Sequence, residues 1–195
     1  MRFKNSVRRV CLVVALFTTI SIAADAQVAV KNNLLYDAAL TPNIGLEVGL
    51  SKKTTGQIFY GLNPWKFSDT KQMRHWTLMP EYRYWLCSKF NGHFFGIHAM
   101  GGEFNVQGIS DPAGILPFSN LKENRYEGWY IGGGLTYGYQ WILNKHWNLE
   151  ASLGVGYDYV QYKKSECGQC GKVTEKDHTN YVGPTKFALS IMYLF

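Results

Sequence analysis

Two long segments in the second half of the chain alternate between apolar and non-apolar residues. From Leu149 to Tyr159 every second residue is apolar or aromatic, and the residues between them are small, polar or charged. The segment from Trp129 to Trp141 repeats this pattern, and only Gly133 interrupts its apolar row. A period of two residues is typical of a β-strand whose two faces meet different surroundings. The pattern therefore predicts an all-β fold.

Eight segments of the chain carry this strand pattern. They are Val28–Leu40, Asn43–Leu50, Gly56–Trp65, Met73–Leu86, His93–Gly102, Gly128–Leu143, Trp147–Tyr162 and Pro184–Phe195. Segments of about ten residues match the roughly 9 to 11 residues that a tilted strand needs to cross a bilayer, whereas strands in soluble proteins are usually about five or six residues long. Because unpaired backbone groups are costly in hydrocarbon, membrane strands must close into a ring. The predicted fold class is an eight-stranded antiparallel transmembrane β-barrel of the outer-membrane type.

The predicted connections differ in length between the two ends of the barrel. The second, fourth and sixth connections are short, which is typical of the periplasmic turns of outer-membrane barrels. The two long connections, Glu103–Glu127 and Lys163–Gly183, then lie outside the cell. Pro80 falls inside a predicted strand, and since proline cannot donate to a β-ladder, a β-bulge is expected there.

The first 26 residues have the features of an export signal. Four basic residues precede a mainly apolar run from Val10 to Ile22, and Ala24-Asp25-Ala26 fits the small-x-small pattern cut by signal peptidases. The run is shorter than the roughly 20 apolar residues of a spanning helix, so cleavage after Ala26 is expected. The predicted domains are a signal peptide at 1–26 and an outer-membrane β-barrel at 27–195, and the predicted location is the outer membrane of a Gram-negative bacterium.

Charge and composition agree with this location. Removal of the signal takes away four of the 20 basic and one of the 14 acidic residues, which leaves a net charge of only +3. This charge is too small to favour nucleic acid as a partner. Aromatic residues make up 15% of the chain, and bacterial barrels carry aromatic girdles at both membrane interfaces. A soluble aromatic-rich sandwich is the less favoured alternative.

With the apolar row facing lipid, the alternate row of charged and small residues faces the lumen. An eight-stranded barrel is only wide enough for side chains to fill it, and an unpaired buried charge is strongly disfavoured. The interior charges are therefore predicted to pair across a plugged lumen. They are Lys31, Asp37, Glu47, Glu81, Arg83, Glu150, Asp158 and Lys186. A sharper alternative is a proton or ion path along the three glutamates and Arg83.

Cys167 and Cys170 form a C-x-x-C motif in the last long connection. A redox role would place such a motif at the start of a helix, and a zinc site would need two further ligands, of which only His178 is near. A local disulfide, free thiols, and metal or redox chemistry remain open in that order of preference. No cofactor or metal is predicted.

The end of the chain resembles an assembly signal. Ile191, Tyr193 and Phe195 are apolar and in step, and Phe195 is the last residue. This arrangement is similar to the terminal signal that the outer-membrane insertion machinery recognises. That machinery and outer-membrane lipid are therefore predicted partners.

Several short motifs along the chain resemble one known family. They are Lys31-Asn32-Asn33-Leu34-Leu35-Tyr36-Asp37, Thr41-Pro42-Asn43-Ile44-Gly45-Leu46-Glu47, Asn63-Pro64-Trp65 and Tyr82-Arg83-Tyr84-Trp85. Together they are similar to a family of Bacteroidetes outer-membrane proteins defined as a domain of unknown function. The resemblance implies a barrel fold. Some members of the family are encoded near fimbrial genes, and no activity or catalytic residue is established for them. The architecture is also similar to small OmpA- and OmpX-type barrels.

The favoured function is that of a non-enzymatic barrel whose long loops contact an extracellular or fimbrial partner. The alternative is a lipid-modifying enzyme of the acyltransferase or lipase type, which would need a nucleophile and a base held together. His75, His98, His146 and His178 fall on different predicted elements, and no serine pairs with them in the lipid-facing row. A third hypothesis, a soluble ligand-binding barrel like a lipocalin, would require the opposite polarity at Glu150, Ser152 and Asp158.

Overall fold

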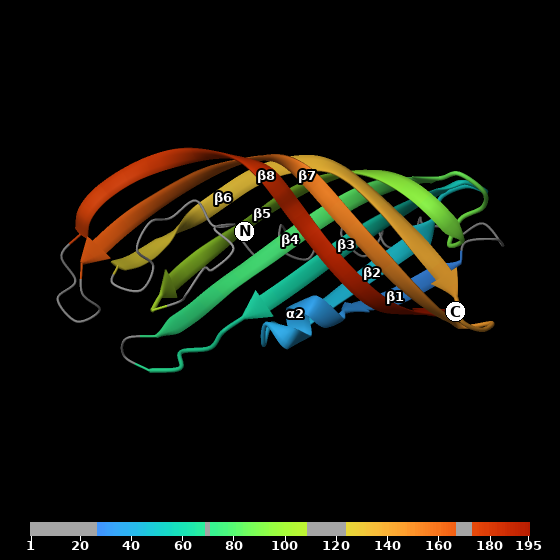
Figure 1. The fold of residues 1–195 in the computed structure, drawn as a ribbon, viewed down its shortest axis with the longest axis horizontal. Coiled ribbons are helices and arrows are strands. Elements are labelled where there is room, and N and C mark those ends of the chain that lie inside the picture. The colour runs from blue at the N-terminus through green and yellow to red at the C-terminus, as the bar shows by residue number, and fades with distance from the viewer. Residues whose placement is uncertain (1–26, 69–70, 109–123, 167–172) are drawn as a thin grey trace, which may run out of the picture.

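The computed structural model describes residues 27–68, 71–108, 124–166 and 173–195. These residues form eight antiparallel strands and one short helix, α2 (Leu34–Ala38). The strands are β1 (Val28–Asn33), β2 (Asn43–Gly49), β3 (Thr54–Asn63), β4 (Gln72–Trp85), β5 (Gly92–Gln107), β6 (Asn124–Ile142), β7 (Trp147–Glu166) and β8 (Val173–Leu194). Each strand pairs with the next, and β8 pairs with β1, so the sheet is a closed barrel (Figure 1). The predicted fold of eight antiparallel strands is confirmed.

The strands lengthen steadily along the chain. β1 has six residues, β4 has 14 and β8 has 22. β1 pairs with β8 only from Ala29 to Asn33, opposite Leu194 to Ser190. The wall is therefore much taller on the side of β5 to β8, which extends past β1 and β2 toward the end away from the C-terminus (Figure 1). We call this taller end the outer end and the opposite end, which carries the short turns, the turn end.

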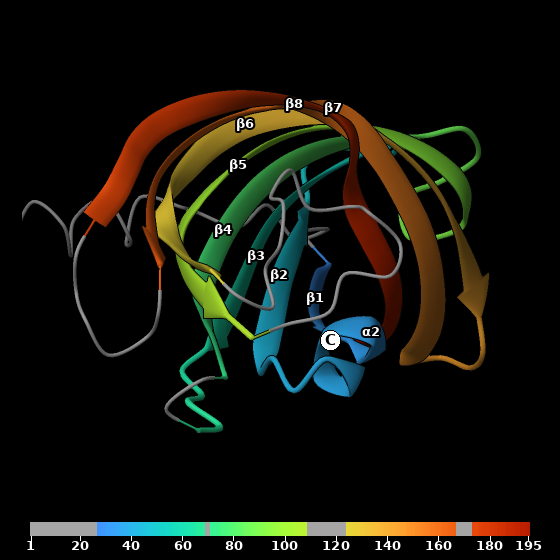
Figure 2. The ribbon, with the colours of Figure 1, turned by 60° about the vertical axis from the view of Figure 1, so that its left-hand side comes forward.

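The prediction of one continuous strand over Val28–Leu40 is wrong in its second half. β1 ends at Asn33, and α2 follows at once. Asn33 is the N-cap of α2, where its side-chain oxygen accepts a hydrogen bond from the Leu35 backbone N–H at 3.1 Å, a role that asparagine performs well. α2 lies against β8 where β1 has ended (Figure 2). The helix therefore fills the gap that the short first strand leaves in the wall.

The expected bulge at Pro80 is also wrong. β3 and β4 stay in one register through Ile58 opposite Pro80, and β4 and β5 keep the same register on both sides of it. The irregularity lies instead between β7 and β8, where Gly154 pairs with Lys186 but Val155 pairs with Pro184. Thr185 is the extra residue of this bulge. Proline does sit at a bulge in this barrel, but in the last strand, next to the level at which β1 ends.

Both long outer connections are shorter than predicted. β5 continues to Gln107 and β6 begins at Asn124, so both ends of Glu103–Glu127 are strand. β7 runs to Glu166 and β8 begins at Val173, so most of Lys163–Gly183 is strand as well. These extensions carry polar residues on their outward face, including Glu127 and Lys163, so the alternation of apolar and polar residues disappears there although the strands continue. The three short turns at the other end are present, at Leu50–Lys53, Leu86–Asn91 and Leu143–His146.

The two faces of the wall have opposite character. Large apolar and aromatic side chains are exposed all around the outside, among them Leu46, Ile58, Ile97, Leu135, Leu153 and Phe187. The alternate residues point inward and are buried, and many of them are polar or charged. Within the described residues, no helix is long and apolar enough to cross a membrane, a finding that has no bearing on crossing by strands.

Candidate functional site

An ion-pair network with Arg83 at its centre occupies the lumen in the half nearer the turn end. Arg83 Nη1 lies 2.9 Å from Glu47 Oε2 and 2.8 Å from Glu150 Oε2, and Nη2 lies 3.0 Å from Glu81 Oε2. The guanidinium therefore bridges carboxylates from three strands, β2, β4 and β7. Its planar fork of donors suits this geometry, which the single ammonium group of lysine could not reproduce.

Two lysines complete the network. Lys31 Nζ lies 2.5 Å from Glu47 Oε2, pairs with Glu150, and donates a hydrogen bond to Gln57 Oε1 at 3.0 Å. Lys186 Nζ lies 2.5 Å from Glu81 Oε2. The network thus contains three carboxylates and three cations, and its formal charge is zero. Buried charges are tolerated when they are paired and hydrogen-bonded in this way.

An apolar cluster forms the floor of the lumen at the turn end. Trp85, Phe90, Phe94, Ala29 and Met192 are buried together. The rings of Trp85 and Phe94 have centroids 4.7 Å apart, and the Arg83 guanidinium stacks 4.5 Å above the Phe94 ring. Trp85 Nε1 donates to Thr55 Oγ1, which in turn donates to Glu47 Oε1. The floor and the network therefore support each other, and together they fill the lumen at this end.

The structure brings six of the eight predicted interior charges into this network. Asp158 also points inward and is buried, but it lies nearer the outer end, and its Oδ1 has no hydrogen-bond partner among the described residues. The prediction for Asp37 is wrong, because Asp37 is exposed on α2, where it accepts a hydrogen bond from Asn43 Nδ2 at 2.9 Å. The strand alternation that would have turned Asp37 inward ends at Asn33, where the helix begins.

Sequence reasoning missed several lumen residues. Gln57 and Thr55 contact the network, and His98 lies between Thr136 Oγ1 and Thr185 Oγ1, at 2.9 Å from each. Each of them lies in the inward row of its strand, at the same level as a charged residue on the same strand or a neighbouring one, for example Gln57 opposite Glu81. Their place in this alternating row could have predicted that they face the lumen. The apolar floor was missed because Trp85 and Phe94 interrupt an otherwise polar inward row.

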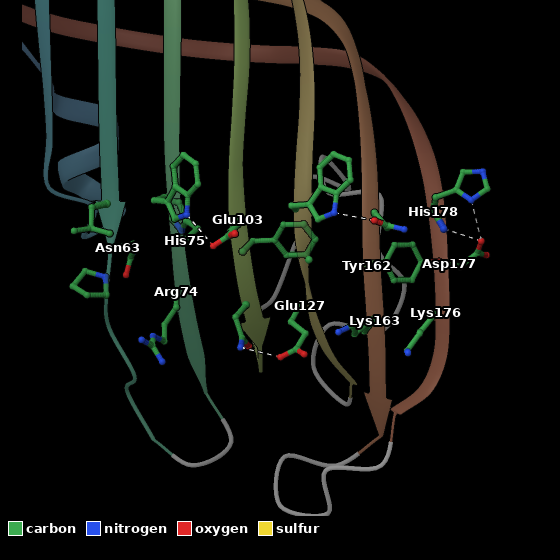
Figure 3. Close-up of a pocket in the computed structure, with 18 residues that line it drawn as sticks. Asn63, Arg74, His75, Glu103, Glu127, Tyr162, Lys163, Lys176, Asp177 and His178 are labelled. Atoms are coloured by element: carbon green, nitrogen blue, oxygen red, sulfur yellow. Dashed lines mark hydrogen bonds and ion pairs between the residues drawn. The ribbon is translucent and has the colours of Figure 1, made fainter. Parts of the chain in front are cut away.

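A cavity of about 840 Å³ lies at the outer end of the barrel (Figure 3). One continuous row of paired residues crosses it from β3 to β8, namely Asn63, His75, Phe104, Gly128, Tyr162 and Asp177. This row is in phase with the inward residues lower on the same strands. The cavity has the size of a small-molecule site, and it mixes aromatic rings with an amide, an imidazole and a carboxylate.

The remaining predicted features have different outcomes. Ile191, Tyr193 and Phe195 face outward near the turn end, where the Tyr193 ring contacts Phe195 and Trp147 with centroids 5.0 and 5.1 Å apart. Cys167 and Cys170 lie outside the described residues, as does the segment 1–26. Among the described residues, Cys87 is a free, exposed thiol, and no group of three or more His, Cys, Asp or Glu side chains could hold a metal ion.

Comparison with known proteins places the chain in one family. No curated protein matches it. A family model described as "Protein of unknown function (DUF3575)" matches residues 10–195, which is nearly the whole chain and includes all the strands of the barrel. The resemblance to a family of unknown function is thereby confirmed. The chain belongs to the DUF3575 family of proteins of unknown function.

Proposed function

We propose that this chain is a small, non-enzymatic outer-membrane β-barrel that is closed to solutes and acts through its outer end. The observation that carries the proposal is the polarity of the wall. Exposed apolar and aromatic side chains surround the barrel, while Arg83 and Glu47 are fully buried inside it. A soluble protein rarely exposes such a continuous apolar surface, whereas a barrel in lipid requires one.

Aromatic residues at both ends of the apolar surface support this orientation. Near the turn end, Trp141 and Trp147 are exposed, and Tyr139, Tyr193 and Phe195 lie beside them. Near the outer end, Trp76 Nε1 donates to Glu103 Oε2 at 3.1 Å, and Trp129 Nε1 donates to Gln161 Oε1 at 2.8 Å. Aromatic side chains with a polar handle favour the membrane interface.

Fractionation tests the membrane location. We expect the chain to leave the envelope only with detergent, and to migrate on a gel differently before and after boiling, because a closed barrel resists unfolding by detergent at room temperature. A soluble periplasmic protein of the same strain serves as the control. Recovery of the chain in the soluble fraction, with no change of migration on boiling, would overturn the proposal.

The ion-pair network supports a closed lumen. Three cations and three carboxylates meet across the interior, and the apolar floor lies beneath them. We expect the purified chain to give no stepwise conductance in planar bilayers, measured beside a porin of known conductance. Stable conductance steps that Arg83→Met alters would instead support an ion path through the network.

The outer end is the part that we assign to interaction. Its tall wall and its cavity lie on the side predicted to face outside the cell, where β5 and β7 end and β6 and β8 begin. A fimbrial component, a polysaccharide or a host surface are the proposed classes of partner. Replacement of the β5–β6 or the β7–β8 connection by a short glycine and serine linker should leave heat-modifiable migration intact and abolish a surface phenotype. Two silent replacements would contradict this assignment.

The proposal includes the absence of lipid-modifying activity. Among the described residues, four histidine rings have polar partners, namely Tyr137 (His93), Thr136 and Thr185 (His98), the Leu194 carbonyl (His146) and Asp177 (His178), and none of these partners is serine. His98 is buried in the lumen. We expect mass spectra of lipid A and phospholipids to be the same in a deletion strain and its parent. A lipid species lost on deletion and restored by the gene would favour an enzyme instead.

A further inference from the structure

A pair of lysines lies where β7 and β8 extend past the apolar surface, in the outward row of both strands and at the edge of the outer-end cavity, whose lining includes both residues (Figure 3). Lys163 and Lys176 are directly opposite each other in the register of the two strands, and both are exposed. Like charges in this position destabilise a sheet. We call Lys163 and Lys176 the basic pair.

Of the acidic side chains that the structure describes, Glu127 and Asp177 lie beside the basic pair, and both have other partners. Glu127, opposite Lys163 on β6, lies 3.2 Å from Arg125 and accepts a hydrogen bond from Asn105. Asp177 is next to Lys176 in sequence, and its Oδ1 accepts from the His178 backbone N–H at 2.7 Å and lies 3.6 Å from His178 Nδ1. Within the described part of the chain, neither lysine of the basic pair has an ion pair or a hydrogen bond. The basic pair is therefore suited to an anion from outside the chain.

The wall just below the basic pair is aromatic. Gln161 and His178 are the next outward pair, and Tyr159 follows. The Tyr159 ring stacks on His178 with centroids 5.6 Å apart, and it contacts Trp129 at 5.8 Å. These rings present flat surfaces with polar edges, a combination that favours the headgroup level of a membrane.

Below the aromatic residues the same strip of wall becomes apolar. Tyr157 and Val182 form one outward pair, and Leu153 and Phe187 form another farther down. Val182 is 79% exposed. Along β7 and β8 the outer surface therefore passes from apolar to aromatic to cationic, in steps of about 7 Å for each two residues. A molecule that fits this order has acyl chains, a polar body and an anionic group.

We propose that the basic pair and the aromatic residues below it bind the phosphate headgroup of an outer-leaflet lipid, and a phosphorylated glycolipid above all. The inference rests on the proposed membrane location, since only that location brings the acyl chains to Val182 and Phe187. Two ammonium groups satisfy the phosphate, and the anion removes the repulsion between them. The lipid thereby stabilises the tall part of the wall.

Native mass spectrometry of the purified full chain in neutral detergent tests the site. The probes are lipid A with its phosphates, the same lipid after enzymatic dephosphorylation, and inorganic phosphate. We expect the chain to retain the phosphorylated lipid preferentially. Lys163→Gln with Lys176→Gln should weaken retention about fivefold per lysine, or roughly 25-fold in all. Lys163→Arg with Lys176→Arg should retain the lipid, because it preserves both charges.

A matched control lies at the opposite end of the barrel. Lys52 and Lys145 are also exposed lysines, on turns at the turn end, and Lys52→Gln with Lys145→Gln should leave lipid retention unchanged. Equal retention by the Lys163→Gln/Lys176→Gln variant and the parent chain, or no preference of the parent for the phosphorylated lipid, would overturn the inference. Displacement of the lipid by equimolar inorganic phosphate would also overturn it, in favour of a soluble anion.

A second readout is the temperature at which the heat-modifiable band disappears. Phosphorylated lipid should raise this temperature for the parent chain and for the arginine variant but not for the glutamine variant, and an equal rise in all three would overturn the inference. Because the measurement uses detergent, it is independent of fractionation. If the chain binds the lipid in detergent but fractionates as a soluble protein, the proposed membrane location is wrong. If the chain is membrane-bound but binds phosphorylated and dephosphorylated lipid equally, the lipid site at the basic pair is wrong.

Discussion

Replacement of Arg83 by methionine should destabilise the folded barrel by about 3–5 kcal/mol, because it breaks a buried charge network at its centre. Arg83 bridges Glu47, Glu81 and Glu150. Without it, three buried carboxylates face only two cations, Lys31 and Lys186. The measurement is the midpoint of urea unfolding in detergent micelles, followed by heat-modifiable migration and by tryptophan fluorescence.

Two further variants separate charge from geometry at this position. Arg83→Lys keeps the charge but not the fork of donors, so its midpoint should fall between those of the parent and Arg83→Met. Arg83→Met combined with Glu150→Gln removes one surplus carboxylate, and its loss of stability should be smaller than the sum of the two single losses. Arg74→Met, at an exposed outward position near the outer end, is the control and should cost little. A loss below about 1 kcal/mol for Arg83→Met would contradict a structural role for the network.

Replacement of Asn33 by alanine should cost at least about 3 kcal/mol, although Asn33 carries no charge. Its Oδ1 accepts from the backbone N–H groups of Leu35 and Leu189 at 3.1 and 3.2 Å, and its Nδ2 donates to the Phe187 carbonyl at 3.1 Å. The side chain thus caps α2 and also continues the ladder along the edge of β8 after β1 has ended. Its loss removes a cap, worth about 1 kcal/mol, and leaves backbone groups of β8 unpaired, at about 1–3 kcal/mol each.

The same urea titration measures this effect. Asn33→Asp keeps an oxygen that accepts from the two backbone N–H groups and loses the Nδ2 donor. At a pH where the new carboxyl group is ionised, this variant should be less destabilised than Asn33→Ala. Asn91→Ala, in an exposed turn at the turn end, is the control. An Asn33→Ala variant as stable as the control would show that α2 and the edge of β8 do not depend on this side chain.

The alternation of residues was enough to predict which face of each strand points inward. Glu150 and Asp158 on β7, and Glu81 and Arg83 on β4, are in phase with their neighbours and are buried in the structure. The reason is local, because successive side chains of a strand point to opposite faces. The same rule failed for Asp37, since it applies only as long as the chain stays extended.

The lengths of the strands could not be predicted in the same way. Above the apolar surface, the outward row of β6 and β7 becomes polar, so Glu127 and Lys163 resemble loop residues in the sequence although they are paired across the two strands. At the other extreme, β1 stops after six residues because Asn33 contacts β8, which lies more than 150 residues away in the chain. A contact of that range leaves no trace in the local pattern. The bulge at Thr185 has the same cause, since it depends on the register between β7 and β8.

The sequence by itself determined that the chain forms eight antiparallel strands with charged residues on the inner side, because the two-residue period and its polarity are properties of each segment alone. The tertiary structure decided the rest. The offset in register between neighbouring strands around the closed ring determined where β1 ends and where α2 fills the gap. It also determined how far β5 to β8 extend at the outer end. Closure of the ring also brought Lys31 on β1 and Glu47 on β2 together with Glu150 on β7 around Arg83, because only a closed barrel makes its first and last strands neighbours.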